Sequence, residues 1–318
     1  MDTDPNPLEP PTLSRRGFLL AGLAGALGVT AAGTTAVLAQ ARPSWAADRV
    51  LVDVTGDYSL VDATTGTEVV VTVRNGVRRI RANGLPNHGT GRFPNAYNPN
   101  TISAQSYDFS LPVRPERADV FTPYDLPQPF GIAVNGVLFD PLANEFWRGD
   151  RASGWQYDAL GGGIDLGLDT SNAHVQPTGA YHYHGVPTGL ASSLPSRRHG
   201  PLVGWAGDGF PIYLARGYRK ATDPSSGVVA LTPSYALRRG TRAGGPGGDY
   251  DGTYVQDWRF VRGRGDLDKA NGRYGVTPEY PRGIYYYVLT DAFPMIPRRF
   301  AGTLAPSFAR TGPPAGPR

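Results

Sequence analysis

The chain of 318 residues contains no cysteine and only five histidines. The lack of cysteine excludes disulfide bonds, thiolate nucleophiles, cysteine-ligated zinc sites and blue-copper centres. Any metal ion must therefore be held by imidazole, carboxylate, amide, phenol or backbone oxygen groups. An excess of one charge is also lacking, because 31 basic and 27 acidic residues leave a formal net charge of only +4. The basic residues form no stripe that would follow a phosphate backbone, so we expect no nucleic-acid partner.

Long apolar runs are scarce, and the clearest one lies near the N-terminus at residues 17–39. The pair Arg15 and Arg16 directly before it is typical of a twin-arginine signal. Small-x-small sequences end at Ala41 and Ala46, and either one fits cleavage by a signal peptidase. A retained membrane anchor is the alternative, since the run is long enough to span a bilayer. Its glycine and threonine content and the two cleavage sequences favour the signal peptide.

These features divide the chain into three parts. We expect residues 1–45 to be a signal peptide that engages the twin-arginine translocase during export. The mature protein is then periplasmic or secreted and has no stable membrane anchor after cleavage. Residues 46–303 are expected to form a single β-rich domain, and residues 304–318 a proline-rich flexible tail.

The composition of the mature part favours an all-β fold. The 42 glycines and 30 prolines interrupt the sequence at short intervals, and no segment has a 3.6-residue apolar repeat of about twelve residues or more. The plainest strand is residues 68–74, which has charged ends and a β-branched centre. We predict an antiparallel β-sandwich or barrel-like domain with long Gly/Pro-rich loops and few short helices.

Three of the five histidines lie between residues 174 and 184. Histidine is the commonest metal ligand, and its side chain titrates near neutral pH. In a strand over residues 180–184, His182 and His184 face the same side, about 6–7 Å apart along the strand. The two tyrosines of the segment then face the opposite side and pack on the core.

The position of His174 depends on the register of a hairpin. Proline and glycine in residues 176–179 predict a turn, with residues 172–176 as the first strand. With a three-residue loop, His174 lies opposite His182 and all three imidazoles converge. With a four-residue turn, His174 pairs with Tyr181 and faces away, because a slip of one residue moves a side chain to the other face. We favour the three-residue loop.

Further residues are candidates to complete a site. His88 lies in a polar loop and is either a fourth ligand, a substrate contact or a loop cap. Asp208 lies between two glycines and is either a metal ligand, a general base or the centre of an Asx turn. His199 follows two arginines and is expected at the surface. The candidate metal ligands are therefore His174, His182, His184, His88 and Asp208, and a site rich in imidazole suits copper or zinc.

Several segments together resemble the family of exported bacterial proteins named after the YHYH motif. They are residues 83–88, 93–95, 98–100, 131–137, 174–185, 204–213, 265–268, 271–273 and 277–279. The resemblance covers roughly residues 80–300, and its motifs are specific because they occur in order. The family name describes a motif, so the resemblance implies no activity or cofactor.

Three functions fit these residues. The leading hypothesis is an exported metal-binding protein with a His-x-His site on a β-hairpin, which is either a metalloenzyme or not an enzyme. The second is a metal-independent hydrolase of cell-envelope or plant polysaccharide, for which His184 and Glu279 are candidate acid–base groups. The third is a non-catalytic envelope module for a small molecule or carbohydrate, in which the histidines only stabilise loops. Asp208 and Glu279 are the candidate catalytic carboxylates.

Overall fold

A computed structural model describes residues 55–195 and 199–309. The expected signal peptide, residues 1–45, lies outside the described residues. Contacts within the chain group the described residues into one unit. No helix in the described part of the chain is long and apolar enough to span a bilayer.

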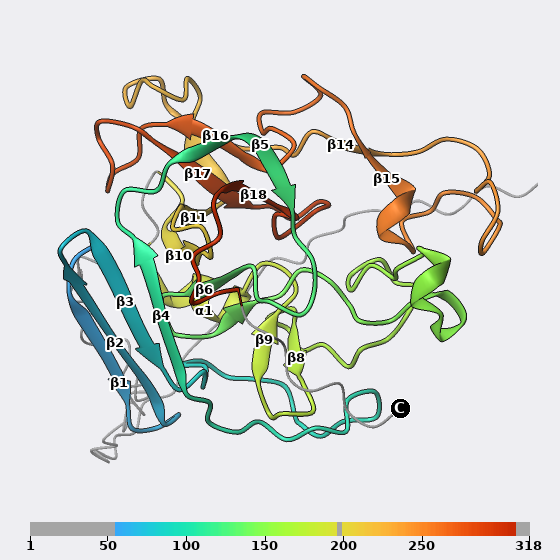
Figure 1. The fold of residues 1–318 in the computed structure, drawn as a ribbon, viewed down its shortest axis with the longest axis horizontal. Coiled ribbons are helices and arrows are strands. Elements are labelled where there is room, and N and C mark those ends of the chain that lie inside the picture. The colour runs from blue at the N-terminus through green and yellow to red at the C-terminus, as the bar shows by residue number, and fades with distance from the viewer. Residues whose placement is uncertain (1–54, 196–198, 310–318) are drawn as a thin grey trace, which may run out of the picture. The chain divides into compact units, whose positions relative to one another are not determined.

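Two sheets hold most of the strands (Figure 1). The four-stranded sheet is antiparallel and has the order β1 (Tyr58–Asp62), β2 (Thr67–Arg74), β3 (Val77–Ala82), β4 (Tyr107–Pro112). The eight-stranded sheet has the order β16 (Gly272–Gly275), β17 (Ile284–Leu289), β11 (Pro211–Leu214), β10 (Leu202–Ala206), β6 (Gly131–Ala133), β7 (Leu138–Phe139), β9 (Tyr181–Tyr183), β8 (Ala173–Val175). Among the described residues, the strand β8 is therefore an edge strand, with β9 as its one neighbour in this sheet.

Shorter elements complete the described part. Three two-stranded ribbons pair β12 (Arg216–Tyr218) with β13 (Val228–Ala230), β14 (Tyr235–Leu237) with β15 (Trp258–Phe260), and β18 (Arg299–Gly302) with β5 (Arg117–Pro123). Among the described residues there is one short α-helix, α1 (Thr188–Ser193), and there are three 3-10 turns, η2 (Trp147–Gly149), η3 (Arg151–Ser153) and η4 (Val255–Asp257).

Local sequence explains the four-stranded sheet. Alternate residues of β2 are buried at its start, as the period of a strand requires. Asn75 and Gly76 both have positive φ, 50° and 78°, and join β2 to β3 in a two-residue hairpin. Asn-Gly is the preferred sequence for this turn because both positions need left-handed backbone.

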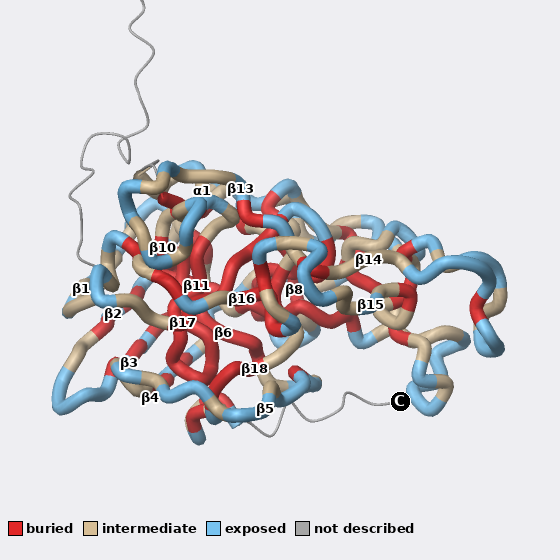
Figure 2. Tube along the Cα trace, turned by 90° about the horizontal axis from the view of Figure 1, so that it is seen from above, coloured by how far each residue is buried: buried red, intermediate tan, exposed pale blue. Residues whose placement is uncertain are grey.

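The two main sheets share one hydrophobic core. Arg78 of the four-stranded sheet lies over the ring of Trp205 in β10, 4.3 Å from its centroid, and Tyr58 stacks on the same ring. Buried residues are concentrated in the strands of the eight-stranded sheet (Figure 2). The hairpin of β8 and β9 belongs to this buried region, because β9 is buried along its whole length.

The all-β prediction is confirmed, with one difference in sheet topology. The eight-stranded sheet is mixed, since β7 pairs with β9 and β11 pairs with β17 in parallel. Parallel partners are joined by long connections and leave no turn sequence between them. Alternating polarity in the sequence therefore predicts where the strands lie but not which strands pair.

The predicted flexible tail begins too early. Residues 304–309 are described, and within them Ala305 and Phe308 are buried. The Phe308 ring stacks on Phe109 of β4 with centroids 4.0 Å apart. The proline content of this segment suggested a tail, but one buried aromatic ring is enough to fix it on the core.

We expect Phe308→Ala to lower the free energy of unfolding by about 3–5 kcal/mol, because it removes a fully buried ring. Urea unfolding of the full chain measures this loss. Val120→Ala, at a side chain that is 76% exposed, is the control and should change stability by less than about 0.5 kcal/mol. Equal stability of Phe308→Ala and the wild type would show that the segment is not part of the core.

Candidate metal centre

The register of the β8–β9 hairpin places His174 opposite His182. The backbone N–H of Gln176 donates to the Ala180 carbonyl at 3.0 Å, and the N–H of Gly179 donates to the Gln176 carbonyl at 2.8 Å. These bonds close the three-residue loop favoured by the sequence, and that prediction is confirmed. His174, His182 and His184 consequently project from one face of the hairpin.

Gly179 fixes this register. Its φ of 84° lies in the left-handed region that favours glycine. A Cβ at this position would lie 1.9 Å from Oγ of Ser103. The backbone N–H of Ser103 also donates to the Gly179 carbonyl at 2.9 Å. A side chain at residue 179 would therefore displace the turn from Ser103 and disturb the register.

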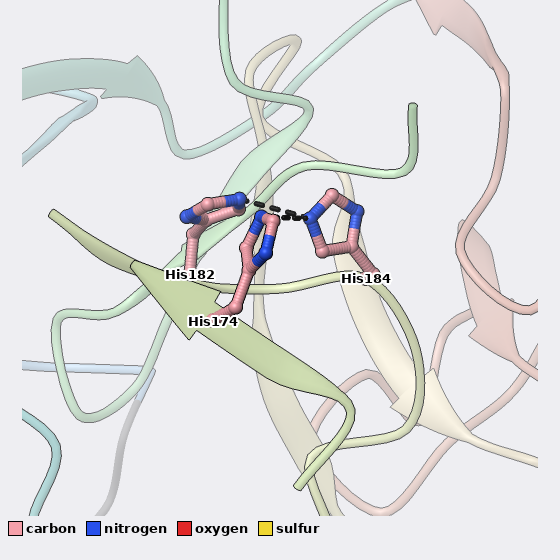
Figure 3. A group of neighbouring side chains, drawn as sticks. All are labelled: His174, His182 and His184. Atoms are coloured by element: carbon pink, nitrogen blue, oxygen red, sulfur yellow. Dashed lines mark hydrogen bonds between the residues drawn. The ribbon is translucent and has the colours of Figure 1, made fainter. Parts of the chain in front are cut away.

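The three imidazoles meet at their Nε2 atoms (Figure 3). Nε2 of His184 lies 2.9 Å from Nε2 of His182 and 3.0 Å from Nε2 of His174. Each pair of ring centroids is 4.7 Å apart, and the rings are inclined at 64–78°. Three histidines around one tetrahedral zinc ion have nitrogens about 3.3 Å apart, so a small outward movement of the rings would admit an ion.

Backbone carbonyls assign the tautomers of two of the rings. Nδ1 of His182 lies 3.1 Å from the Ala180 carbonyl, and Nδ1 of His174 lies 2.8 Å from the Leu166 carbonyl. A carbonyl only accepts, so both Nδ1 atoms carry the proton and both Nε2 atoms present lone pairs. The Asn98 amide is 3.2 Å from Nδ1 of His174, but it donates to the Val175 carbonyl at 3.0 Å.

His184 cannot satisfy both neighbours by hydrogen bonding. If its Nε2 carries a proton, that proton reaches only one of the two lone pairs that face it. If Nε2 carries none, three lone pairs converge. Its Nδ1 is buried and has no hydrogen-bond partner among the described residues. In both tautomers a buried polar atom remains unsatisfied, which costs about 1–3 kcal/mol.

Burial keeps the three rings neutral. The side chains of His182 and His184 are each only 2% exposed. Desolvation lowers the pKa of His182 to about 4. Desolvation and, to a smaller extent, the charge of a protonated His182 lower the pKa of His174 to about 4. The same causes, with the charge of Arg298, hold the pKa of His184 well below its usual range. At neutral pH all three rings are thus free of the extra proton that would compete with a metal.

Two further groups of the site were missed by the sequence reasoning. Asp140 follows β7 and is buried, and its Oδ2 accepts from Nε2 of Gln176 at 3.3 Å. Arg298 precedes β18. Burial raises the pKa of Asp140 and the charge of Arg298 opposes this rise, whereas for His184 the same charge adds to the lowering of the pKa by burial and by the other two histidines. No local motif marks either residue. Asp140 is placed by the parallel pairing of β7 with β9, and Arg298 comes from a segment far along the chain.

His88 does not join the three histidines. Its Nε2 accepts from the Tyr183 hydroxyl at 2.7 Å, and its ring stacks on Tyr183. The side chain of Tyr183 points away from the histidine face because neighbouring residues of a strand alternate. His88 therefore lies behind β9, where it supports Tyr183 together with Asn135, whose amide donates to the same hydroxyl at 3.0 Å.

Asp208 also lies apart from the histidines. Its carboxylate accepts from the Tyr287 hydroxyl at 2.5 Å and from the backbone N–H groups of Ala301 and Gly302 at 3.1 and 2.9 Å. It thereby ties the β10–β11 turn to β18. Only His174, His182 and His184 form a group of possible metal ligands in the described part of the chain.

Glu279 and His199 lie in a separate cluster. Glu279 accepts from the Tyr213 hydroxyl at 2.9 Å. The expected exposure of His199 is wrong, since the residue is 2% exposed and its ring contacts Tyr213 and Tyr218. The pair of arginines before it suggested a surface loop, but rings of the nearby strands β11 and β12, and that of Tyr286 in β17, bury it.

Comparison with known proteins agrees with this motif. A family model described as YHYH protein matches residues 108–302, which is more than half of the chain. The chain belongs to the YHYH protein family. No curated protein and no solved structure matches this YHYH protein. In the YHYH segment, residues 181–184, the side chains of the two histidines point toward the candidate metal centre, and those of the two tyrosines point toward the hydrophobic core.

The lowered pKa values predict how the metal-free protein responds to acid. Between about pH 6.5 and 4 the unfolded histidines bind protons that the folded ones do not, so stability falls as the pH falls through this window. Burial raises the pKa of Asp140 to about 7, which acts in the opposite sense. We therefore compare urea unfolding of the wild type with that of His182→Gln and expect a shallower pH slope in the variant. Identical slopes would contradict neutral, buried imidazoles.

Proposed function

We propose that this YHYH protein is an exported metal-binding protein that holds one copper or zinc ion through Nε2 of His174, His182 and His184. The observation that carries the proposal is the meeting of these three atoms, two of which are turned inward as lone pairs by bonds from Nδ1 to backbone carbonyls. Outer contacts of this kind fix the tautomer of metal-bound histidine in many proteins.

The chemistry of the ligands selects the class of metal. Three imidazoles without a carboxylate suit zinc or copper and do not suit calcium or magnesium, which prefer oxygen. Three protein ligands also leave a fourth position for water or a small molecule. This arrangement differs from structural zinc sites, which are closed by four protein ligands.

An ion resolves the unfavourable contact at the centre. Without one, neutral imidazoles offer one proton at most to the Nε2–Nε2 contacts, and at least one lone pair faces another nitrogen. With an ion, all three lone pairs bind it and His184 carries its proton on Nδ1. Burial of the rings makes the ion-free state less favourable and therefore favours the ion-bound state.

The direct test is metal content after loading. Zinc- or copper-loaded wild type, freed of excess metal, should contain about one ion per chain by elemental analysis. His182→Ala/His184→Ala should weaken metal binding by more than about 100-fold, because even the loss of outer contacts costs 10–100-fold. His88→Gln is the matched control, a histidine behind the same strand, and should bind as the wild type does. Sub-stoichiometric metal in the loaded wild type, unchanged in the double variant, would refute the proposal.

We also propose export through the twin-arginine translocase, on the basis of Arg15, Arg16 and the apolar run that follows them. In a bacterium that has this translocase, Arg15→Lys/Arg16→Lys should leave the precursor in the cytoplasm, as cell fractionation and immunoblotting will show. Arg42→Lys, a change of the same kind near the expected cleavage sites, should be exported normally. Equal export of both variants would exclude this route.

A further inference from the structure

Asp140 lies on the same side of the sheet as the three histidines. Parallel pairing places Leu138 beside His182 and Phe139 beside Tyr183, and the Asp140 N–H donates to the Tyr183 carbonyl at 2.9 Å. Alternation along the strand then turns Asp140 to the face of His182 and away from the tyrosines. The contact of Gln176 with the Asp140 carboxyl supports this position, because Gln176 and His174 share a face of the hairpin.

The carboxyl of Asp140 is held in place and kept from bulk water. The Tyr124 hydroxyl donates to Oδ1 at 2.8 Å, and Gln176 donates to Oδ2 at 3.3 Å. Burial raises the pKa of Asp140 to about 7. A carboxyl with such a pKa exchanges protons efficiently near neutral pH, which is the property of a general base.

The positive charge of Arg298 acts on this carboxyl, whose pKa it lowers against the larger effect of burial. Its Nη2 donates to Asp158 at 2.7 Å, and its backbone carbonyl accepts from the N–H of Tyr124 at 3.0 Å. Its Nε and Nη1 are buried and have no hydrogen-bond partner among the described residues. Buried donors without a partner are costly in the resting protein but can stabilise a negative charge that forms during a reaction.

A pocket adjoins the site. It has a volume of about 380 Å³, is open to solvent and is lined by Ala159, Gly162, Gly163, Ile164, Asp165, Leu166 and Leu168. Leu166 belongs to both features, since it lines the pocket and its carbonyl accepts from Nδ1 of His174. The lining combines apolar side chains with the Asp165 carboxyl and backbone groups, and it suits a small group that has both apolar and polar atoms.

We propose that the metal centre hydrolyses small carboxylic esters, with Asp140 as general base, the charge of Arg298 stabilising the oxyanion and the pocket beside His174 holding the acyl group. This inference rests on the proposed metal binding. The ion, held by the three histidines, would supply a polarised water molecule; Asp140 would take a proton from this water as its oxygen attacks the carbonyl carbon, so that a C–O bond forms and the carbonyl oxygen becomes negative. The bond to the alkoxide then breaks, and Asp140 returns the proton to the leaving oxygen. The net reaction is ester and water to acid and alcohol, without redox change.

The test uses zinc-loaded full-length protein and 4-nitrophenyl acetate. We expect the loaded wild type to release nitrophenolate faster than the chelator-treated protein, and Asp140→Asn to lower this rate by about 100-fold or more while it keeps its zinc. Asp268→Asn is the control, because Asp268 also accepts a tyrosine hydroxyl, that of Tyr285 at 3.1 Å, but has a place outside the site. It should keep the wild-type rate.

Each outcome is decisive. A loaded wild type no faster than the metal-free protein, a full rate in Asp140→Asn, or cleavage of 4-nitrophenyl phosphate in place of the acetate would overturn the ester hydrolase. Failure of the wild type to retain zinc would instead refute the metal site itself. If Asp140→Asn does not fold, Tyr124→Phe takes its place; it removes one bond to the carboxyl, should slow the reaction several-fold and should leave the zinc content unchanged.

Discussion

The pairing of His174 with His182 across the β8–β9 hairpin is the constraint on which the site depends. It puts three imidazoles on one face, and a shift of one residue would turn the first of them away. Gly179 enforces the register through its positive φ and its close approach to Ser103. The tyrosines of the same strand hold it from behind, since Tyr181 donates to Asp169 at 2.7 Å and Tyr183 is bonded to His88. Alternate residues of the YHYH segment thus have two roles: the histidines form the polar centre, and the tyrosines anchor the strand from the other face.

Burial gives this arrangement its chemical meaning. Three exposed histidines would hydrogen-bond to water and titrate near their ordinary pKa. Here desolvation keeps the rings neutral, and two carbonyls turn their lone pairs toward a common point. A polar centre of this kind is unfavourable unless something binds the converging lone pairs. The proposed metal ion would offset the unfavourable burial of this cluster, and Asp140 and Arg298 are the charged groups proposed to act with it.

The sequence predicted local structure well and long-range structure poorly. The hairpin, its register and the facing of its histidines follow from turn residues and strand alternation, which act over a few positions. The places of His88 and Asp208 do not, because each contacts a strand far along the chain: His88 bonds to Tyr183, and Asp208 bonds to Tyr287. Asp140 was missed for a related reason, since parallel pairing of β7 with β9 leaves no turn signal between them. The early start assigned to the tail overlooked a single buried ring, that of Phe308.

The central claim is that His174, His182 and His184 bind one ion together. X-ray absorption spectroscopy of the zinc-loaded, full-length protein tests it most directly, because outer-shell scattering counts the imidazole rings around the ion. The account predicts a first shell of nitrogen and oxygen at about 2.0–2.1 Å that contains three imidazoles and one further light atom. A shell of oxygen atoms, or one with no more than a single imidazole, would contradict it.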